Sequence, residues 1–215
     1  MKKANCMFIT ALMLCCALSG CASSFANRES SAPTPTETTR LQRVSPPLAT
    51  NTINDAKLTV QLTFNRAGTM AANQYAVWIE NANHELVKTL YVSDFTANGG
   101  YRRRSESLPT WVAKANPAKM EAAQIDAISS ATPQSGVQNY SWNGTDENGE
   151  KIVPGEYHLF VEGTLYWTSS VLFSGAFTWG GAPCSIVITP SYTEPDNETN
   201  KDMITQVAAE YTAGI

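Results

Sequence analysis

An alternation of apolar and polar residues over 57–64 most constrains what this chain can fold into. Leu58, Val60, Leu62 and Phe64 share one face, with polar residues between them, as is typical of a strand buried on one side. Similar runs, each bounded by Gly, Pro, Asn or Asp, cover residues 75–80, 86–92, 137–142, 155–165, 170–179 and 185–189. Short strands separated by turn signals predict an all-β fold, most simply a β-sandwich.

Local signals predict three further elements. Residues 75–92 form a β-hairpin in this interpretation, because the polar segment 81–84 separates two strand-like runs. The insertion 107–132 interrupts the strands, and good helix formers at 118–124 predict a short helix within it. The apolar residues of 203–211 fit both a helix and a strand, so both remain open.

The first 21 residues have the pattern of a bacterial lipoprotein signal. Lys2 and Lys3 precede an apolar run, 7–18, which is shorter than the roughly 20 residues needed to cross a membrane. Two small residues then lead to Cys21, whose thiol would accept a diacylglycerol after cleavage. We expect lipidation of Cys21 and a membrane anchor; the alternative is an ordinary cleaved signal in which Cys21 is incidental.

The chain divides into four predicted segments. Residues 22–56 are rich in Ser, Thr, Pro and Asn and poor in apolar residues, which indicates a disordered tether. The predicted segments are the signal peptide, 1–20; lipidated Cys21 and the linker, 21–56; one sandwich domain, 57–190; and an acidic loop with a C-terminal strand or short helix, 191–215. By resemblance to other lipoproteins, Ala22 implies the outer membrane of a Gram-negative host, facing the periplasm or the surface.

Charge excludes nucleic acid as a principal partner. The chain has 15 Lys and Arg against 19 Asp and Glu, a net charge of −4. Cleavage makes it more negative, because Lys2 and Lys3 leave and no acid does. Nucleic-acid binding requires clustered cations. We expect as partners the membrane, through the lipid, and an unidentified envelope protein.

The residues predict no catalytic and no metal site. After signal cleavage and lipidation Cys184 is the remaining thiol, so we expect no internal disulfide and a buried, unreactive Cys184. His84 and His158 lack neighbours at metal-ligand spacing. No nucleophile motif, phosphate loop or carboxylate pair stands out. The expectation is a protein that is not an enzyme.

The best-defined motif spans residues 141–157. Two Asn-Gly pairs in it supply the positive φ angles that turns require, and Trp142 and Tyr157 can pack across the connection. Oxygens at 146–148 suggest a calcium loop, but the alternating ligands and distal Glu of such loops are missing. A solvated turn is the preferred interpretation.

Two resemblances follow from these motifs. The 141–157 segment resembles the Ig-like domain of flagellar hook-cap proteins, with Asn143 in place of Asp, which implies an Ig-like, FlgD-like β-sandwich without a flagellar role. Over residues 57–190 the chain is similar to a family of predicted periplasmic proteins, domain of unknown function 2271. The elements that carry this resemblance are Tyr-Ala-Val-Trp-Ile-Glu, Val-Lys-Thr-Leu-Tyr-Val, Leu-Pro-Xaa-Trp, the Asp-Ala segment at 126–132 and the Trp hairpin.

The Asp-Ala segment is the candidate site for chemistry. It is similar to the acceptor motif at which a flavin transferase links FMN to threonine through a phosphoester. The resemblance makes Thr132 the acceptor and Asp126 the motif's acid, with Ser130 where the motif has Gly. An ordinary turn is the other interpretation, since Pro, Gln, Ser and Gly follow Thr132.

Arg102, Arg103 and Arg104 form a short basic run. Guanidinium groups bind phosphate in a bidentate way, so these residues are candidates to contact a flavin phosphate or a lipid headgroup. The alternative is a solvated loop.

Together these observations predict an extracytoplasmic, membrane-anchored lipoprotein. We expect a non-catalytic binding or accessory component of an envelope redox system, without a bound cofactor. One alternative is an electron carrier with FMN attached at Thr132. A second is a structural or adhesion module.

Overall fold

The computed structural model describes residues 55–69 and 72–214. These residues belong to the second of two compact units, Ala49–Ile215. The predictions for Cys21, the signal peptide 1–20 and the tether 21–54 lie outside the described residues. Within the described part, no helix is long and apolar enough to span a membrane.

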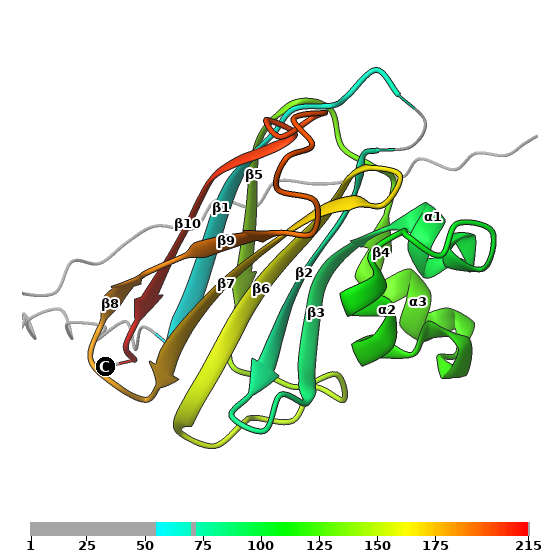
Figure 1. Ribbon diagram of the computed structural model, residues 1–215. Helices are drawn as coiled ribbons and strands as arrows, with labels where there is room; N and C mark the ends of the chain where they lie inside the picture. The colour runs from blue at the N-terminus through cyan, green and yellow to red at the C-terminus, as the bar shows by residue number, and fades with distance from the viewer. Residues whose placement is uncertain (1–54, 70–71, 215) are drawn as a thin grey trace, which may run out of the picture. The chain divides into compact units, whose positions relative to one another are not determined.

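Two β-sheets form the described domain (Figure 1). One has the strand order β5-β1-β10-β8 and the other β4-β3-β2-β6-β7-β9. Their bounds are β1 Lys57–Phe64, β2 Gln74–Asn81, β3 Leu86–Ser93, β4 Ser129–Ser130, β5 Gly136–Trp142, β6 Gly155–Tyr166, β7 Ser169–Trp179, β8 Cys184–Ile186, β9 Thr189–Tyr192 and β10 Ile204–Thr212. The prediction of an all-β sandwich is confirmed.

The alternation in β1 builds the core between the sheets. Leu58, Val60, Leu62 and Phe64 are all buried and belong to one apolar cluster with side chains from both sheets. Each such side chain contributes about 1.5–3 kcal/mol by leaving water. The β2–β3 hairpin is also as predicted, with the two strands antiparallel.

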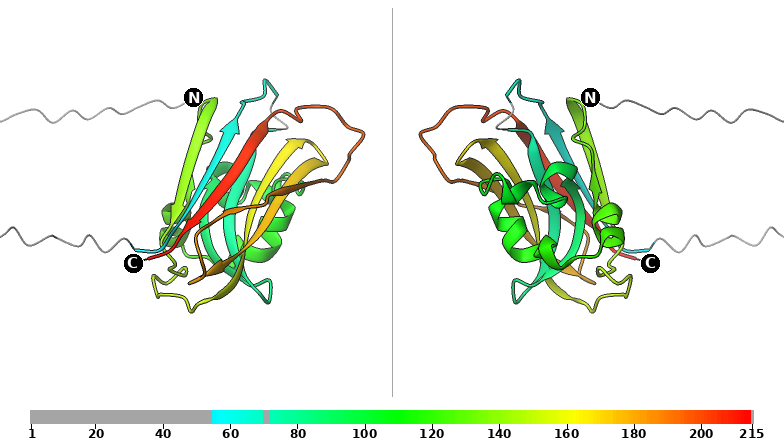
Figure 2. Two further views of the ribbon diagram at one scale, coloured as in Figure 1. Left: turned by 90° about the vertical axis from the view of Figure 1, so that its left-hand side faces the viewer. Right: turned by 90° about the vertical axis from the view of Figure 1, so that its right-hand side faces the viewer.

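Helices cover the outer face of the six-stranded sheet (Figure 2). The predicted insertion 107–132 holds α2 Pro109–Ala115, η2 Pro117–Lys119 and α3 Ala122–Ile128, and two short helices, α1 Asp94–Ala97 and η1 Gly100–Arg102, precede it. The helix expected at 118–124 is therefore shifted, because the side chains of Glu121 and Gln124 form a capping box that starts α3 at Ala122. The predicted helical insertion is larger than the sequence indicated, since α2 was not expected.

A strand residue supports the start of α2 from outside the helix. Leu108, which precedes α2, provides no side-chain cap. Instead the buried carboxylate of Glu162 in β6 accepts the backbone N–H groups of Thr110 at 3.0 Å and Trp111 at 2.8 Å. Burial raises the pKa of Glu162, partly opposed by these two hydrogen bonds. Glu162 thus ties the helical layer to the sheet.

The C-terminal region contains β8, β9 and β10. It decides one prediction that was left open and contradicts two others. Residues 204–212 form β10, so the strand alternative is the correct one, and β10 lies between β1 and β8. The single strand expected at 185–189 is wrong: the chain makes two short strands in different sheets, since it crosses between the sheets after Ile186. The expected burial of Cys184 is also wrong, because Cys184 is exposed on the edge strand β8.

The 141–157 motif connects the two sheets. The rings of Trp142 and Tyr157 pack edge to face with centroids 5.8 Å apart, as predicted. Gly144 has φ +75°, and a Cβ there would lie 2.1 Å from the Trp179 ring, so both conformation and space require glycine. The Asp146 carboxylate accepts two backbone N–H groups within its own turn, each at 2.9 Å, and the Lys88 ammonium of β3 donates to the Asp146 carbonyl oxygen at 2.9 Å.

Candidate functional site

A surface cavity of about 600 Å³ lies where β1 ends and β2 begins. Its lining comes from three parts of the chain: the β1–β2 connection, the α1–η1 region and the loop after β4. The residues with functional side chains in that lining are Arg66, Gln74, Phe95, Arg104 and Thr132. We call this the arginine cavity. It brings together Thr132 and Arg104, two of the residues singled out in the sequence.

Asn73 fixes the β1–β2 wall of the arginine cavity. It adopts φ +71°, a left-handed conformation that Asn tolerates better than most residues. Its side-chain oxygen accepts the N–H of Ala67 at 2.7 Å, while its amide donates to the carbonyl oxygens of Ala67 at 2.8 Å and Thr69 at 3.2 Å. The wall is therefore held by side-chain bonds in place of a sheet ladder.

Thr132 sits in the wall formed by the loop after β4. It is half-buried, and its hydroxyl donates to the Asn73 carbonyl oxygen across a long 3.4 Å. The same loop is joined to the β1–β2 connection by the Arg66 N–H, which donates to Ser135 Oγ at 2.8 Å. Because the Thr132 hydroxyl oxygen only donates here, it retains its lone pairs for a new bond.

The other residues of the flavin-acceptor motif lie elsewhere. Ser130 is in β4, where it pairs in parallel with Ser93 of β3, and it does not adopt a positive φ. Serine in place of glycine therefore causes no backbone strain at this position. Asp126 is on the exposed surface of α3 and does not line the arginine cavity. The structure brings Asp126 and Thr132 into neighbouring elements but not into one lining.

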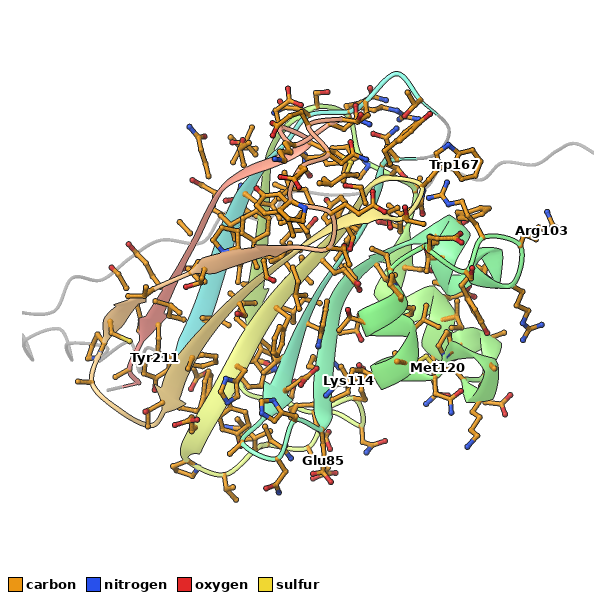
Figure 3. All side chains as sticks on the ribbon, in the orientation of Figure 1. Glu85, Arg103, Lys114, Met120, Trp167 and Tyr211 are labelled. Carbon is orange, nitrogen blue, oxygen red and sulfur yellow. The ribbon has the colours of Figure 1, made fainter. Side chains whose placement is uncertain are left out.

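The three predicted arginines are in different surroundings. Arg104 is half-buried, and its guanidinium carbon lies 5.5 Å from the centre of the Phe95 ring. Burial lowers the pKa of Arg104, and nearby Glu106 partly opposes that shift. Arg102 and Arg103 are exposed outside the cavity lining, and Figure 3 shows Arg103 extending away from the molecule. Arg104 is the member of the run that reaches the cavity.

Close packing of the α1–η1 turn positions Arg104. A Cβ on Gly100 would lie 2.2 Å from the Phe95 carbonyl oxygen, so the backbone approaches Phe95 closely because residue 100 is glycine. The Arg104 N–H donates to the Gly100 carbonyl oxygen at 3.0 Å. The backbone at residue 104 is thereby held close to Phe95.

Arg66 was not predicted as a site residue. It lies two residues after the end of β1, and its place after an apolar run was the available signal, but no local pattern pairs it with Arg104. The fold does so, because the end of β1 and the α1–η1 region meet at the same cavity.

Three tyrosines, Tyr75, Tyr91 and Tyr140, pack together within the sandwich. The hydroxyl groups of Tyr75 and Tyr140 are 2.5 Å apart, and the Tyr75 and Tyr91 ring centres are 4.5 Å apart. Burial raises the pKa of all three phenols. All three phenols are neutral at ordinary pH. Tyr75 directly follows Gln74, which lines the cavity.

A second polar cluster connects α2 to the β2–β3 hairpin. Buried Glu80 accepts the Trp78 indole N–H at 2.8 Å and the Lys114 ammonium at 3.0 Å. The rings of His84 and His158 lie 5.2 Å apart beside it, a proximity that their sequence positions did not reveal. Among the described residues, no group of three or more His, Cys, Asp or Glu could hold a metal ion.

Comparison with known proteins supports the family assignment. The model of the family described as "Predicted periplasmic protein (DUF2271)" matches residues 55–193. The chain belongs to this family. The DUF2271 match covers most of the described domain, including the arginine cavity, and its periplasmic description agrees with the expected location in the cell envelope. The search of curated proteins gave no match.

Solved structures similar to this DUF2271 protein include two crystal structures of truncated FlgD from Helicobacter pylori, one of them from strain 26695. Their sequences are 18% and 19% identical to this chain, and the alignments cover 71% of it and 82% and 81% of FlgD. The TM-score is 0.29 in both cases. FlgD is the hook-cap class that the 141–157 motif resembled, and at this level of similarity we draw no functional argument from it.

Proposed function

We propose that this protein is a lipid-anchored component of the cell envelope that binds a ligand in the arginine cavity without catalysing a reaction. In this proposal it serves an extracytoplasmic redox system. One observation carries it: Arg66, Arg104 and Thr132, from three distant parts of the sequence, line a single cavity of about 600 Å³. That volume is within the range of small-molecule sites.

The character of the lining supports binding. The polar side chains of the lining include hydrogen-bond donors and two cations, and the aromatic ring of Phe95 lies in the same lining. Burial lowers the pKa of Arg104, and a bound anion would favour the charged form of its guanidinium. The walls are held by Asn73 and Gly100, so little rearrangement is needed before a ligand binds.

The test is ligand-induced stabilisation of the full-length protein, purified in detergent from its own host. We expect extracts of the host envelope to raise the melting temperature of the wild type, because a ligand that binds only the folded state stabilises it by mass action. The rise should be reduced in an Arg104→Gln variant. It should be retained in Lys151→Gln, which removes a cation that does not line the cavity. Equal responses in all three proteins would contradict the proposed site.

A second candidate function is an electron carrier with FMN linked covalently to Thr132. Two observations favour it: the Thr132 hydroxyl lies in the cavity wall with lone pairs available, and Ser130 occupies its position without strain. Such an attachment would place the flavin phosphate at Thr132 and the ring system in or over the cavity.

Intact mass and visible absorption test this candidate. Protein from the host envelope is compared with Thr132→Ala and with Thr69→Ala, a control that removes another threonine of the same cavity. We expect the mass of one FMN and yellow absorption in the wild type and the control, and neither in Thr132→Ala. Absence of FMN from the wild type while the host's transferase is active would remove this candidate and leave the non-covalent one.

A further inference from the structure

β5 is a long strand at an unpaired edge of the four-stranded sheet. All 7 residues of Gly136–Trp142 pair with β1 without a bulge, and no strand of the described residues lies on the other side of β5. Figure 2 shows β5, drawn in yellow-green, at the margin of the domain in both views. An edge strand presents a row of backbone N–H and C=O groups that can pair with a further strand.

The other sheet edges in the described part of the chain are short or blocked. β4 has 2 residues, β8 has 3 and β9 has 4, and β9 contains Pro190, which has no N–H to donate. On the open side of β3, the Glu147 carboxylate accepts the Thr89 N–H at 2.6 Å. β5 has no proline, no charged residue and no bulge. Because natural sheets block long edges by these devices, the open edge of β5 indicates a strand that pairs in the working protein.

The composition of β5 suits pairing with a second copy of itself. Two identical strands can pair antiparallel about a two-fold axis, so that each residue meets either itself or its symmetric counterpart. A charged residue at the axis would then face a like charge, which destabilises a strand pair. A strand that meets a different partner is under no such restriction. The lack of charge throughout 136–142 therefore favours a second copy as the occupant of this edge.

Full overlap of the two strands places Asn139, the central residue of β5, on the axis. Val137, Asn139 and Ser141 are the exposed residues of the strand, and Val137, which is 56% exposed, would lie opposite Ser141 of the second copy. Gln61 Nε2 donates to Asn139 Oδ1 at 3.0 Å, which orients the amide of Asn139. Its Nδ2 has no acceptor among the described residues, so it can donate across the axis to the other Asn139.

We propose that β5 joins two copies of this protein edge to edge, antiparallel about a two-fold axis through Asn139. The two four-stranded sheets then form one continuous sheet. The inference goes beyond the proposed function, because the arginine cavity has no β5 residue in its lining. One strand on each copy is a smaller contact than the roughly 1,200–2,000 Å² of stable complexes. The dimer therefore depends on a high local concentration, which the proposed lipid anchor would supply.

Cysteine cross-linking in the host envelope tests the position of the axis. Asn139→Cys is introduced into the full-length protein together with Cys184→Ser, which removes the exposed natural thiol, and membranes are treated with a mild thiol oxidant. Two thiols give two protons and two electrons to the oxidant and form one disulfide. We expect a covalent dimer that is lost on reduction. Glu210→Cys, exposed on β10 of the same sheet, is the matched control, and no more dimer from Asn139→Cys than from this control would overturn the proposal.

Charge variants test the two-fold symmetry. Asn139→Lys and Asn139→Asp each place like charges opposite one another, so each should self-associate about fivefold more weakly than the wild type. The measurement is sedimentation equilibrium of the full-length protein in detergent, with circular dichroism to verify folding. An equimolar mixture of the two variants places opposite charges across the axis and should recover the wild-type association. Ala208→Lys, exposed on β10, controls for net charge. Failure of the mixture to associate better than either variant alone would refute the two-fold arrangement.

Other occupants of the edge give different results. A disulfide between Asn139→Cys and a different envelope protein, without the dimer, would overturn the proposal in favour of a partner's strand. Slow hydrogen exchange of β5 amides in dilute, monomeric protein would assign the edge to the chain's own linker and also overturn it. Exchange that slows as the protein concentration rises supports the dimer. None of these results depends on whether the arginine cavity binds a ligand, so the two proposals can fail separately.

Discussion

Removal of the Glu162 side chain should destabilise the domain by uncapping α2. The Glu162→Ala change deletes the acceptor of two backbone N–H groups, those of Thr110 and Trp111. Trp111 is fully buried, as is Leu108 just before the helix, so water does not easily replace the carboxylate. α2 and the part of the outer core that it carries would lose their fixed position on the sheet.

The magnitude follows from the two hydrogen bonds. A buried donor left without its partner costs about 1–3 kcal/mol, so the two N–H groups together cost about 2–6 kcal/mol. Relief from burying a carboxylate offsets part of this. We therefore expect a net loss of about 2–4 kcal/mol in the free energy of unfolding, which is a substantial part of the stability of an ordinary domain.

Urea unfolding followed by tryptophan fluorescence and circular dichroism measures this loss. With an m-value of about 1–3 kcal/mol per molar urea, the midpoint should fall by roughly 1–2 M. Glu156→Ala, which removes an exposed glutamate from the same strand, is the matched control and should change stability by less than about 0.5 kcal/mol. Equal midpoints for the two variants would refute the capping role of Glu162.

The pH dependence gives a separate test of the same residue. Burial raises the pKa of Glu162 above its ordinary value of 4.5, so in the window above pH 4.5 the folded state holds a proton that the unfolded state has released. The stabilisation linked to that proton is complete below pH 4.5 and is lost as pH rises through the raised pKa. The wild type should therefore lose stability relative to Glu162→Gln as pH rises from 4.5, and a difference independent of pH would contradict this.

Three further variants have defined outcomes. Gly144→Ala should destabilise the domain by about 2 kcal/mol or more in urea unfolding, because the new Cβ meets the Trp179 ring in a left-handed conformation; an unchanged midpoint would contradict the packing. Trp167 is 54% exposed with φ +43°, so Trp167→Gly should raise stability by about 1 kcal/mol, and a loss would show that its ring contributes more than the strain costs. Cys21→Ser should move the protein from the membrane to the soluble fraction, whereas continued membrane fractionation would refute the lipid anchor.

Sequence reasoning succeeded where one face of a strand is buried. Period-2 patterning located β1, and the turn signals located β2, β3, β5, β6 and β7, because alternation and turn chemistry are local properties. It failed at residues 185–189, where the apolar run around Val187 does not reveal which sheet each residue joins. The pairing partners, β10 for one half and β7 for the other, are distant in the sequence.

Part of the candidate site could be predicted from the sequence, because some of its residues belong to local motifs. Thr132 and Arg104 were identified from local motifs, and the structure places both in one lining. Arg66 was missed because no local pattern distinguishes it from any arginine after a strand, and its relation to Arg104 arises from the packing of α1 near the end of β1. Arg102 and Arg103 share the sequence motif of Arg104, but the turn directs them outward.

The inner position of β1 has a mechanical consequence for a tethered protein. If residues 21–56 are the tether that we propose, force reaches the domain at this strand, which is paired on one side with β5 and on the other with β10. A pull applied along β1 acts parallel to the strand, whereas the hydrogen bonds of both ladders run perpendicular to it. Tension between the membrane and a partner at the far end would therefore load the bonds of two ladders together in shear, rather than peeling an edge strand away one bond at a time.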